Sequence, residues 1–396
     1  MSSTVVIVGA GIYGLTAALE LRGRGHRVQL LDPGPLPHPL AESTDISKAI
    51  RLDYGPDEDY LALMETALTR WRQWNTEWPE PLFHETGVVF LCRAPLQPGG
   101  FEYESLRLLL QHGHRPHRLN ADDIAQRYPA WKSAGYTDGY FNPVGGYAYS
   151  GQVMTWLLQQ AQALDVELSE GQTFERFIES HNKVTGVVTR AGSRFEGESV
   201  VIATGAWTPH ILQSSMPEMT GVFRSNGMPV FHLKPSQPEL FCAEVFPVFG
   251  ADVTLTGYYG FPLHPINGVV KIADHGPGRH LPPESLERNV TEAETTRLRA
   301  FLAETLPALA DAPITYTRAC IYCDTWDGHF WIARHPERAG LVVATGGSGH
   351  GFKFAPVLGG LIADVVEGQT NPYLHKFRWR PEVRPARSEE AARHQE

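Results

Sequence analysis

The segment RACIYCDTWDGHFWI contains two cysteines, Cys320 and Cys323, separated by two residues in a chain that has only four cysteines. Cysteines at this spacing can form a redox pair, contribute half of a metal site, or attach a cofactor through sulfur. A thioredoxin-like pair opens a helix after a strand, whereas Asp, Thr, Asp and Gly follow this pair. No second such pair completes a zinc site, so we predict no metal site. The pair alone leaves its role open.

A second chemical pattern lies near the N-terminus, in TVVIVGAGIYGLTAALELRGRGHRVQLLD. An apolar strand at residues 5–8 leads into Gly9, Gly11 and Gly14, a helix follows, and a second apolar strand ends before Asp32. The first glycine permits a tight turn, the second lets a pyrophosphate approach the backbone, and the third lets helix and strand pack closely. An acid at the end of the second strand can bind a ribose hydroxyl and disfavours the extra phosphate of NADP. The pattern predicts a dinucleotide site for FAD or NAD.

Composition excludes several classes of partner. The formal net charge is −10 and no basic stripe is visible, so we expect no nucleic-acid partner. No apolar run approaches the roughly 20 residues of a membrane-spanning helix, and we expect no membrane partner. The first residues run directly into the predicted strand, which leaves no room for a signal peptide, and cysteines are few. We therefore expect a cytoplasmic protein.

Two later segments lead the chain back to the predicted nucleotide sheet. The first is an apolar strand that ends in Ala203, Thr204 and Gly205, just before Trp207. The second is AGLVVATGGSGHGFKFAPVLGGLIADVVEG, in which a strand, a glycine-rich turn and a helix follow one another. The N-terminus of that helix could stabilise the pyrimidine carbonyl or the anionic reduced form of a flavin. Such returns are typical of flavoproteins with a two-dinucleotide-binding fold.

The chain of 396 residues is long enough for two domains. We predict that residues 1–45, 150–215 and 325–381 form the dinucleotide-binding domain, and that residues 46–149 and 216–324 form a second domain of mixed strands and helices. Within the second domain, DEDYLALMETALTRWRQWNTEW has the period of an amphipathic helix. The polar residues 382–396 are predicted to form a flexible tail.

Across residues 4–380 the sequence resembles the sarcosine-oxidase-like amine oxidases of the D-amino-acid-oxidase superfamily. That family includes monomeric sarcosine oxidase, N-methyltryptophan oxidase, pipecolate oxidase and the fructosyl-amino-acid oxidases. The motifs that carry the resemblance, in the family's order, are VGAGIYG, SKAIRLDYG, YYGFP, VVKIADHG, RACIYCDTWDGHFWI and GGSGHGFKF. The resemblance implies an α/β fold of the D-amino-acid-oxidase type, in which discontinuous segments build a Rossmann-like FAD-binding domain beside an α+β substrate domain.

The resemblance suggests an answer to the question raised by the cysteines. In this family a cysteine at the position of Cys320 holds the flavin through a thioether at its 8-methyl position. Attachment through Cys323 and a non-covalent flavin remain alternatives. A covalent bond prevents loss of the cofactor and typically raises the reduction potential of the flavin.

Lys271, in the segment GVVKIADHG, matches the family's lysine that activates oxygen above the flavin. A fixed cation in a dry site stabilises the negative charge that develops when oxygen receives its first electron. Without the resemblance, a lysine in an apolar strand would be interpreted as an edge residue whose ammonium reaches solvent.

Other side chains match the family's substrate site. Arg51 and Lys353 match two cations that hold the substrate carboxylate, a group for which a guanidinium fork is well suited. His275 matches an active-site histidine, and a strand would place it on the same face as Lys271, four residues earlier. Two further aromatic residues match residues near the flavin ring: Tyr259 and Tyr322.

The predicted FAD contacts combine the glycine-rich turns with the residues at the strand ends. They are Gly9, Gly11, Gly14, Asp32, Ser43, Lys48, Thr204, Gly205, Trp207, Cys320, Gly347, Gly349, Gly351 and Lys353. Lys48 stands where sarcosine oxidase has a second arginine. The segment DISKAIR is more similar to the corresponding motif of the fructosyl-amino-acid oxidases. This departure argues against sarcosine itself as the substrate.

The resemblance implies an FAD-dependent oxidase of a secondary amine in an N-substituted or cyclic α-amino acid. Hydride would pass to flavin N5, water would hydrolyse the resulting imine, and O2 would be reduced to hydrogen peroxide. The expected partners are therefore an amino-acid-like small molecule and O2, with the chain a monomer or a small homo-oligomer. A flavin dehydrogenase that passes electrons to a quinone or carrier, and a non-catalytic flavin-binding protein, are the alternatives.

Overall fold

The fold was obtained as a computed structural model, which describes residues 2–132, 135–213, 215–285 and 287–384. The tail predicted at residues 382–396 therefore lies outside the described residues from residue 385 onward. Among the described residues, no helix combines the length and the apolarity that a membrane span requires. Within the same residues, no cluster of three or more His, Cys, Asp or Glu side chains could hold a metal ion.

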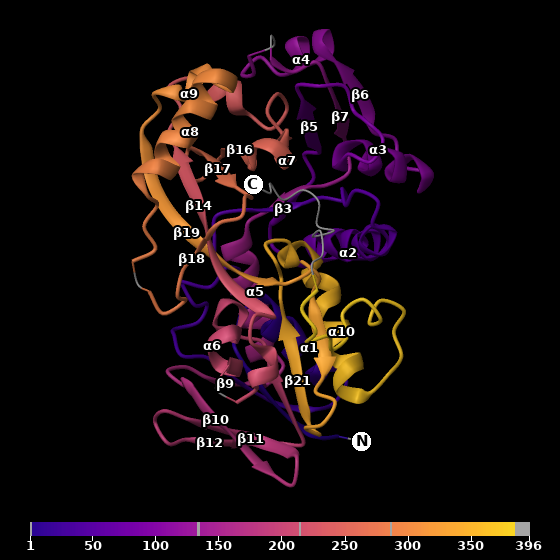
Figure 1. The fold of residues 1–396 in the computed structure, drawn as a ribbon, viewed down its shortest axis with the longest axis vertical. Helices are drawn as coiled ribbons and strands as arrows, with labels where there is room; N and C mark the ends of the chain where they lie inside the picture. Colours follow the sequence, from indigo (N-terminus) through magenta and orange to yellow (C-terminus); the bar gives the residue numbers. More distant parts are fainter. Residues whose placement is uncertain (1, 133–134, 214, 286, 385–396) are drawn as a thin grey trace.

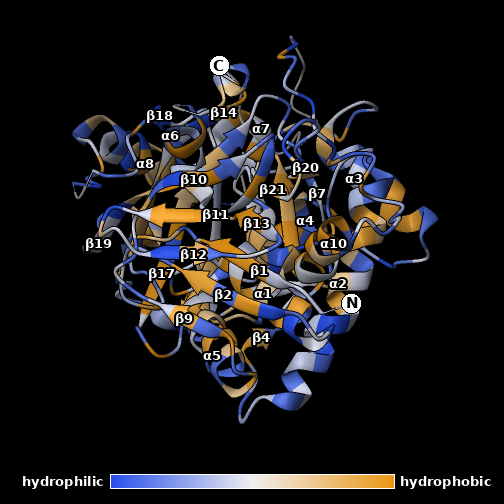
Figure 2. Cartoon of the chain, turned by 90° about the horizontal axis from the view of Figure 1, so that it is seen from below, coloured by the Kyte–Doolittle hydropathy of each residue, from blue (hydrophilic) through white to orange (hydrophobic). Residues whose placement is uncertain are grey.

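The first large sheet contains the predicted βαβ unit at its centre. Its strands, in spatial order, are β20 (Trp331–Arg334), β21 (Leu341–Thr345), β13 (Ser199–Ile202), β1 (Thr4–Val8), β2 (Arg27–Leu31) and β9 (Glu167–Ser169). All neighbours pair in parallel except β20 and β21. The central strands are strongly apolar in Figure 2 and are covered on both faces, as parallel strands require.

Helices and a small sheet cover this first sheet. The helix α1 (Ile12–Gly23) follows β1 and packs against α5 (Ser150–Ala163) and α10 (Ala355–Glu367). A separate antiparallel meander consists of β10 (Phe174–Ser180), β11 (Lys183–Thr189) and β12 (Arg194–Glu196), and it lies at the lower end of Figure 1. The predicted strands that return to the nucleotide sheet are confirmed as β13 and β21.

The glycine-rich turn after β21 differs in detail from the prediction. The α-helix begins only at Ala355, because a 3₁₀ turn, η5 (Gly351–Phe354), precedes it. The indole Nε1 of Trp71, on α2 (Glu58–Glu77), donates a hydrogen bond to the carbonyl oxygen of Lys353 at 2.7 Å. The amphipathic helix predicted in DEDYLALMETALTRWRQWNTEW is therefore present as α2. Its buried Trp71 holds the turn that carries Lys353.

The second large sheet lies in the upper half of Figure 1. Its strands, in spatial order, are β18 (Arg279–His280), β14 (Phe223–Leu233), β17 (Val269–Asp274), β16 (Tyr258–His264), β15 (Val248–Ala251), β5 (Val88–Cys92), β7 (Asp138–Asn142) and β6 (His117–Asn120). The long strand β19 (Ile314–Thr325) pairs antiparallel with β14 along its length. A short sheet joins β3 (Lys48–Ile50), β8 (Gly146–Ala148) and β4 (Phe83–His84).

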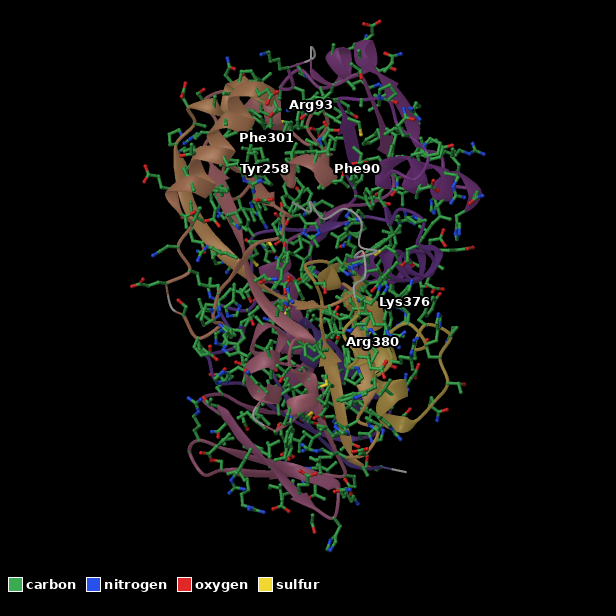
Figure 3. The ribbon with its side chains drawn as sticks, viewed as in Figure 1. Phe90, Arg93, Tyr258, Phe301, Lys376 and Arg380 are labelled. Carbon is green, nitrogen blue, oxygen red and sulfur yellow. The ribbon has the colours of Figure 1, made fainter. Side chains whose placement is uncertain are left out.

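Helices on the outer side complete this half of the molecule. They are α3 (Phe101–Gln111), α4 (Ala121–Arg127), α7 (Val253–Thr256), α8 (Glu292–Thr305) and α9 (Pro307–Ala310), while α6 (Thr208–Gln213) follows β13. The ring of Phe301 on α8 packs on Tyr258 of β16 with centroids 4.3 Å apart, and both lie far from the meander in Figure 3. This packing joins α8 to the sheet that carries Tyr259 and Tyr322.

Candidate active site

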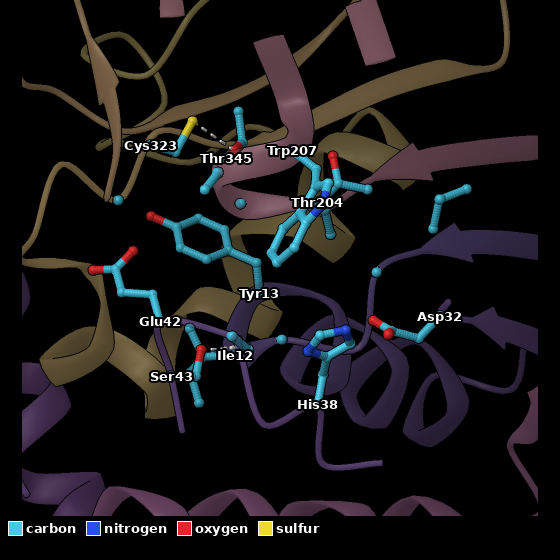
Figure 4. Close-up of a pocket in the computed structure, with 18 of the residues that line it drawn as sticks. Ile12, Tyr13, Asp32, His38, Glu42, Ser43, Thr204, Trp207, Cys323 and Thr345 are labelled. Carbon is cyan, nitrogen blue, oxygen red and sulfur yellow. Dashed lines mark hydrogen bonds between the residues drawn. The ribbon is translucent and has the colours of Figure 1, made fainter. Parts of the chain in front are cut away.

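A cavity with a volume of about 190 Å³ runs across the carboxyl ends of β1, β13 and β21. Most of the predicted FAD contacts line it (Figure 4): Gly9, Gly11, Asp32, Ser43, Lys48, Thr204, Gly205, Trp207, Gly347 and Gly351. Ligands of open α/β sheets bind at this edge of the strands. The larger cavity therefore coincides with the predicted dinucleotide site.

The glycines of the first turn are required by the backbone around them. Gly9 has φ +102°, and a Cβ there would stand 2.5 Å from the carbonyl oxygen of Ala203. Gly14 does not line the larger cavity, and a Cβ there would lie 1.8 Å from the carbonyl oxygen of Gly9. Gly14 thus keeps the first turn of α1 close to β1, which is the packing role expected of the third glycine.

The lining of the larger cavity fits a dinucleotide such as FAD. The helix α1 begins at Gly11 without a capping side chain, and the N–H of Ile12 donates to Ser43 Oγ at 3.1 Å. A Cβ on Gly11 would meet only Ser43 Oγ, at 3.7 Å, so the glycine leaves space beside the positive end of the helix. The buried hydroxyl of Tyr13, in the wall, has no hydrogen-bond partner among the described residues.

Asp32, the predicted ribose-binding residue, is held by two backbone N–H groups. Its Oδ2 accepts the N–H of Ala10 at 2.8 Å and its Oδ1 accepts the N–H of Gly34 at 3.1 Å. Burial raises the pKa of the carboxyl, and the two donated N–H groups act in the opposite direction. The carboxyl is thereby fixed at the end of β2, facing the cavity in Figure 4.

A smaller cavity of about 70 Å³ adjoins the larger one, because Lys48 and Phe352 line both. Most of the predicted substrate-site residues line it: Arg51, Lys353, His275, Tyr259 and Tyr322, together with Gly349. Tyr259 lies on β16, Tyr322 on β19 and Lys353 on η5. The other three follow β3, follow β17 and precede η5, respectively: Arg51, His275 and Gly349. Residues far apart in the sequence therefore meet beside the predicted flavin position.

Arg51 and Lys353 form the cationic end of this smaller cavity. The guanidinium of Arg51 lies over the ring of Tyr54, 5.1 Å from its centroid, and donates to the carbonyl oxygen of Asp53. Lys353 Nζ donates to Tyr54 Oη at 3.1 Å, and Tyr54 Oη also lies 3.1 Å from His350 Nδ1. Tyr54 thus orients both cations towards one region, and the side chains of Tyr54 and His350 are almost fully buried.

Tyr259, Tyr322 and His275 also line the smaller cavity and lie close to one another. The two tyrosine hydroxyl oxygens are 3.5 Å apart, and the His275 ring centroid lies 6.1 Å from that of Tyr259 and 6.0 Å from that of Tyr322. The expectation that His275 and Lys271 lie on one face of a strand is wrong for His275, which lies outside the strand. The strand β17 ends at Asp274, and of the two residues only His275 lines the cavity.

Lys271 lies behind the cavity wall. Its Nζ donates to Asp45 Oδ2 at 2.5 Å and to the carbonyl oxygen of Ser47 at 2.6 Å. The same ammonium lies 4.7 Å from the ring centroid of Phe261, which does line the smaller cavity. Burial lowers the pKa of Lys271 to about 8, although Asp45 acts to raise it. Lys271 is therefore a buried cation that lies against Phe261 and lines neither cavity.

The two cysteines point to opposite sides of β19, as an odd spacing on a strand requires. Cys320 Sγ lies 3.9 Å from Lys48 Nζ, whereas Cys323 Sγ accepts a hydrogen bond from Thr345 Oγ1 at 3.4 Å. Cys323 lines the larger cavity and Cys320 lines neither cavity described here. Burial raises the pKa of the Cys323 thiol to about 12. Both thiols are free, so the pair is not a disulfide.

Several residues of the site carried no predicted role. Asp45 belongs to DISKAIR, and His350 belongs to GGSGHGFKF, so both lie inside motifs that the sequence analysis used. Tyr54 follows Arg51 in KAIRLDYG. The position of Asp45, Tyr54 and His350 within these motifs was the signal that the sequence offered. Residues that they contact lie elsewhere in the chain, so the sequence did not assign them a role.

The chain matches the family model described as FAD dependent oxidoreductase over residues 4–365. Among curated relatives, L-saccharopine oxidase of Schizosaccharomyces pombe is 27% identical, and the match covers 96% of this chain and 94% of that protein. Monomeric sarcosine oxidase of Bacillus sp. (strain B-0618) is 26% identical, with 94% of each chain covered. Among solved structures, fructosamine oxidase (Amadoriase II) of Aspergillus fumigatus superposes with a TM-score of 0.84 at 26% identity, covering 100% of this chain and 94% of that chain.

Proposed function

Because the chain belongs to the FAD dependent oxidoreductase family, we propose that it is an oxidase of a secondary amine in an N-substituted or cyclic α-amino acid. The overall reaction oxidises the C–N bond to an imine, which water hydrolyses, and reduces O2 to hydrogen peroxide. The observation that carries the proposal is the pair Arg51 and Lys353 in a cavity that meets the larger cavity at Lys48 and Phe352. The named activities of the relatives support the same reaction class.

FAD, when bound, would accept a hydride, which carries two electrons, from the substrate and would pass these electrons on to oxygen. The residues that would hold it are the N-terminus of α1, the carboxyl of Asp32 and the wall around Trp207. We further propose that Cys320 attaches the flavin covalently. Lys48 Nζ lies 3.9 Å from this sulfur, and Lys48 also lines the larger cavity, so Cys320 adjoins the predicted flavin site through Lys48.

The first test is the electron acceptor. Purified enzyme is mixed with N-methyl and cyclic amino acids, and oxygen consumption is compared with peroxide release and with reduction of an artificial dye. We expect peroxide in equal amount to the oxygen consumed. Rapid dye reduction with negligible oxygen consumption would instead favour a dehydrogenase.

We expect Arg51→Met to lower kcat/KM for an α-amino-acid substrate by about 10-fold to 100-fold, mainly through KM, because a charge-assisted hydrogen bond contributes roughly 1.5–3 kcal/mol. Arg51→Lys keeps the positive charge but loses the forked geometry of the guanidinium, so its decrease in kcat/KM should be smaller. The matched substrate is the same secondary amine without its carboxylate. A purely structural role for Arg51 predicts equal losses on both substrates, and that result would contradict carboxylate binding.

Part of the wall of the smaller cavity is apolar. It is formed by Val88 and Phe90 of β5, by Val248 of β15, and by Val253 and Phe261. The strands β5 and β15 pair in parallel with Val88 opposite Val248, so both side chains lie on one face. A substrate group that reaches this wall is therefore expected to be aliphatic or aromatic.

This wall predicts a substrate order. We expect kcat/KM for L-pipecolate and N-methyl-L-leucine to exceed that for N-fructosylglycine by about tenfold or more, because each buried hydroxyl without a partner costs roughly 1–3 kcal/mol. L-Saccharopine, with its additional carboxylate, should also be a poor substrate. The panel is measured by peroxide release at equal enzyme concentration. A preference for either polar substrate would refute the apolar wall as a determinant of specificity and leave the oxidase reaction itself intact.

A further inference from the structure

Asp45 is a buried carboxylate that the proposed function does not use. It precedes β3, its side chain is 5% exposed, and its Oδ2 accepts a hydrogen bond from Lys271 Nζ at 2.5 Å. Its Oδ1 accepts the N–H of Ile46 at 2.7 Å, and its carbonyl oxygen accepts the N–H of Gly151 at 2.8 Å. The loop thus holds the carboxylate, and α5 holds the backbone carbonyl of the same residue.

Three cations surround this single carboxylate. Lys48 Nζ lies 3.9 Å from Asp45 Oδ2 and Arg318 Nη2 lies 4.0 Å from it, in addition to Lys271. Burial together with the three cations leaves the pKa of Asp45 well below its usual range, because the cations outweigh the burial. Asp45 therefore stays ionised throughout the working pH range.

Other titratable groups face the cluster from neighbouring strands. They are His232 on β14, His264 and Tyr259 on β16, and Cys320 on β19. Burial lowers the pKa of His232 to about 4 and also lowers that of His264, so both imidazoles are neutral at pH 7. Burial raises the pKa of Tyr259, which stays protonated. Asp45 is the carboxylate that lies within 4.0 Å of all three cations.

Lys271 is the member of the cluster that would lose its proton first. Arg318 remains protonated at all working pH values. Burial alone would lower the pKa of Lys48, but Cys320, Asp45 and Glu42 raise it above its ordinary value. Lys271, in contrast, already has a pKa near 8 while Asp45 is ionised. Removing the charge of Asp45 takes away the strongest group that favours its ammonium form.

We propose that Asp45 is the positioning residue that keeps Lys271 charged and holds its ammonium beside Phe261, behind the wall of the smaller cavity, and so sets the pH range in which the enzyme reacts with oxygen. The proposal rests on the oxygen role of Lys271 in the proposed function. It assigns to Asp45 a role through the lysine, without contact with the substrate.

The test uses Asp45→Asn, which keeps the shape of the side chain and removes its charge. Reduction of the holoenzyme by substrate without oxygen, and reaction of the reduced enzyme with oxygen, are timed separately between pH 6 and pH 9. At pH 8 we expect the oxygen reaction to slow by about 5-fold to 50-fold, for a lysine pKa that falls by one or two units. The rate should recover towards the wild-type value at pH 6, while reduction by substrate changes little.

Two matched variants separate the outcomes. Asp57→Asn removes another buried carboxylate, which pairs with Lys376 at 2.5 Å and caps α2, a role that asparagine also fills. It should lower stability without moving the pH profile of the oxygen reaction. Lys271→Met should slow the oxygen reaction at every pH without recovery. A loss in Asp45→Asn that is the same at all pH values, or no loss, overturns the proposal.

Thermal unfolding gives a readout independent of activity. Because the folded-state pKa of Lys271 lies below its unfolded value, the unfolded chain binds more protons between about pH 8 and the ordinary lysine pKa near 10.4, and this lysine makes stability rise with pH there. In Asp45→Asn the start of this rise should move below pH 8, and Lys271→Met should lack it. If Lys271→Met reacts normally with oxygen, the oxygen role fails, and the unfolding data still decide whether Asp45 controls the charge of Lys271.

Discussion

Replacing Lys271 by methionine is expected to slow the reaction of the reduced enzyme with oxygen by about 100-fold to 1000-fold. A fixed donor or cation at a site of developing negative charge contributes roughly 2.7–4 kcal/mol, and methionine keeps the length of the side chain without its charge. The ammonium is buried, 2% exposed, so water screens it little. Reduction by the substrate should stay near the wild-type rate, because Arg51 and Lys353 are untouched.

Stopped-flow mixing of the reduced variant with oxygenated buffer measures this rate directly. Folding should survive the change, since Asp45 keeps Lys48 and Arg318 as partners after Lys271 is removed. Flavin content and the unfolding midpoint serve as controls for integrity. Oxygen reactivity equal to that of the wild type would remove Lys271 from the oxygen reaction.

Replacing Cys320 by serine is expected to release the flavin from the polypeptide. In acid-precipitated wild-type protein the yellow colour should remain in the pellet, and in Cys320→Ser it should move to the supernatant. The expected difference is all or none, because serine cannot form a thioether. Mass mapping of the coloured peptide from the wild type identifies the attached residue independently.

Cys323→Ser is the matched control, and we expect its colour to stay in the pellet. The position of Cys323 in the cavity favours it as the attachment residue, whereas the raised pKa of its thiol disfavours it. Cys323 lines the larger cavity, but burial raises the pKa of its thiol to about 12, and a protonated thiol is a poor nucleophile. Cys320 lies beside Lys48, a permanent cation. Colour lost from Cys323→Ser and retained in Cys320→Ser would reverse the assignment.

The sequence by itself determined the dinucleotide site, because contiguous residues encode it. A strand, three glycines, a helix and a second strand ending in Asp32 constrain one another within a single βαβ unit. Inside that unit the carbonyl of Gly9 requires glycine at position 14, whereas the carbonyl of Ala203, remote in sequence, requires glycine at position 9. Buried strands and amphipathic helices were recognisable for the same reason. The resemblance then predicted which distant residues share a substrate site, and the smaller cavity does bring Arg51 and Lys353 together.

Only the tertiary structure decided how the buried charges pair. Lys271 and Asp45 lie in separate motifs, and neither spacing nor composition shows that their side chains meet at 2.5 Å. The alternation along β19 separates Cys320 from Cys323 by face, but the partner of each face comes from β3 or β21. Electrostatic interactions depend on distance and burial, which are set by the packing of segments remote in sequence. The charge state of the site therefore depends on the tertiary structure and could not be predicted from the sequence.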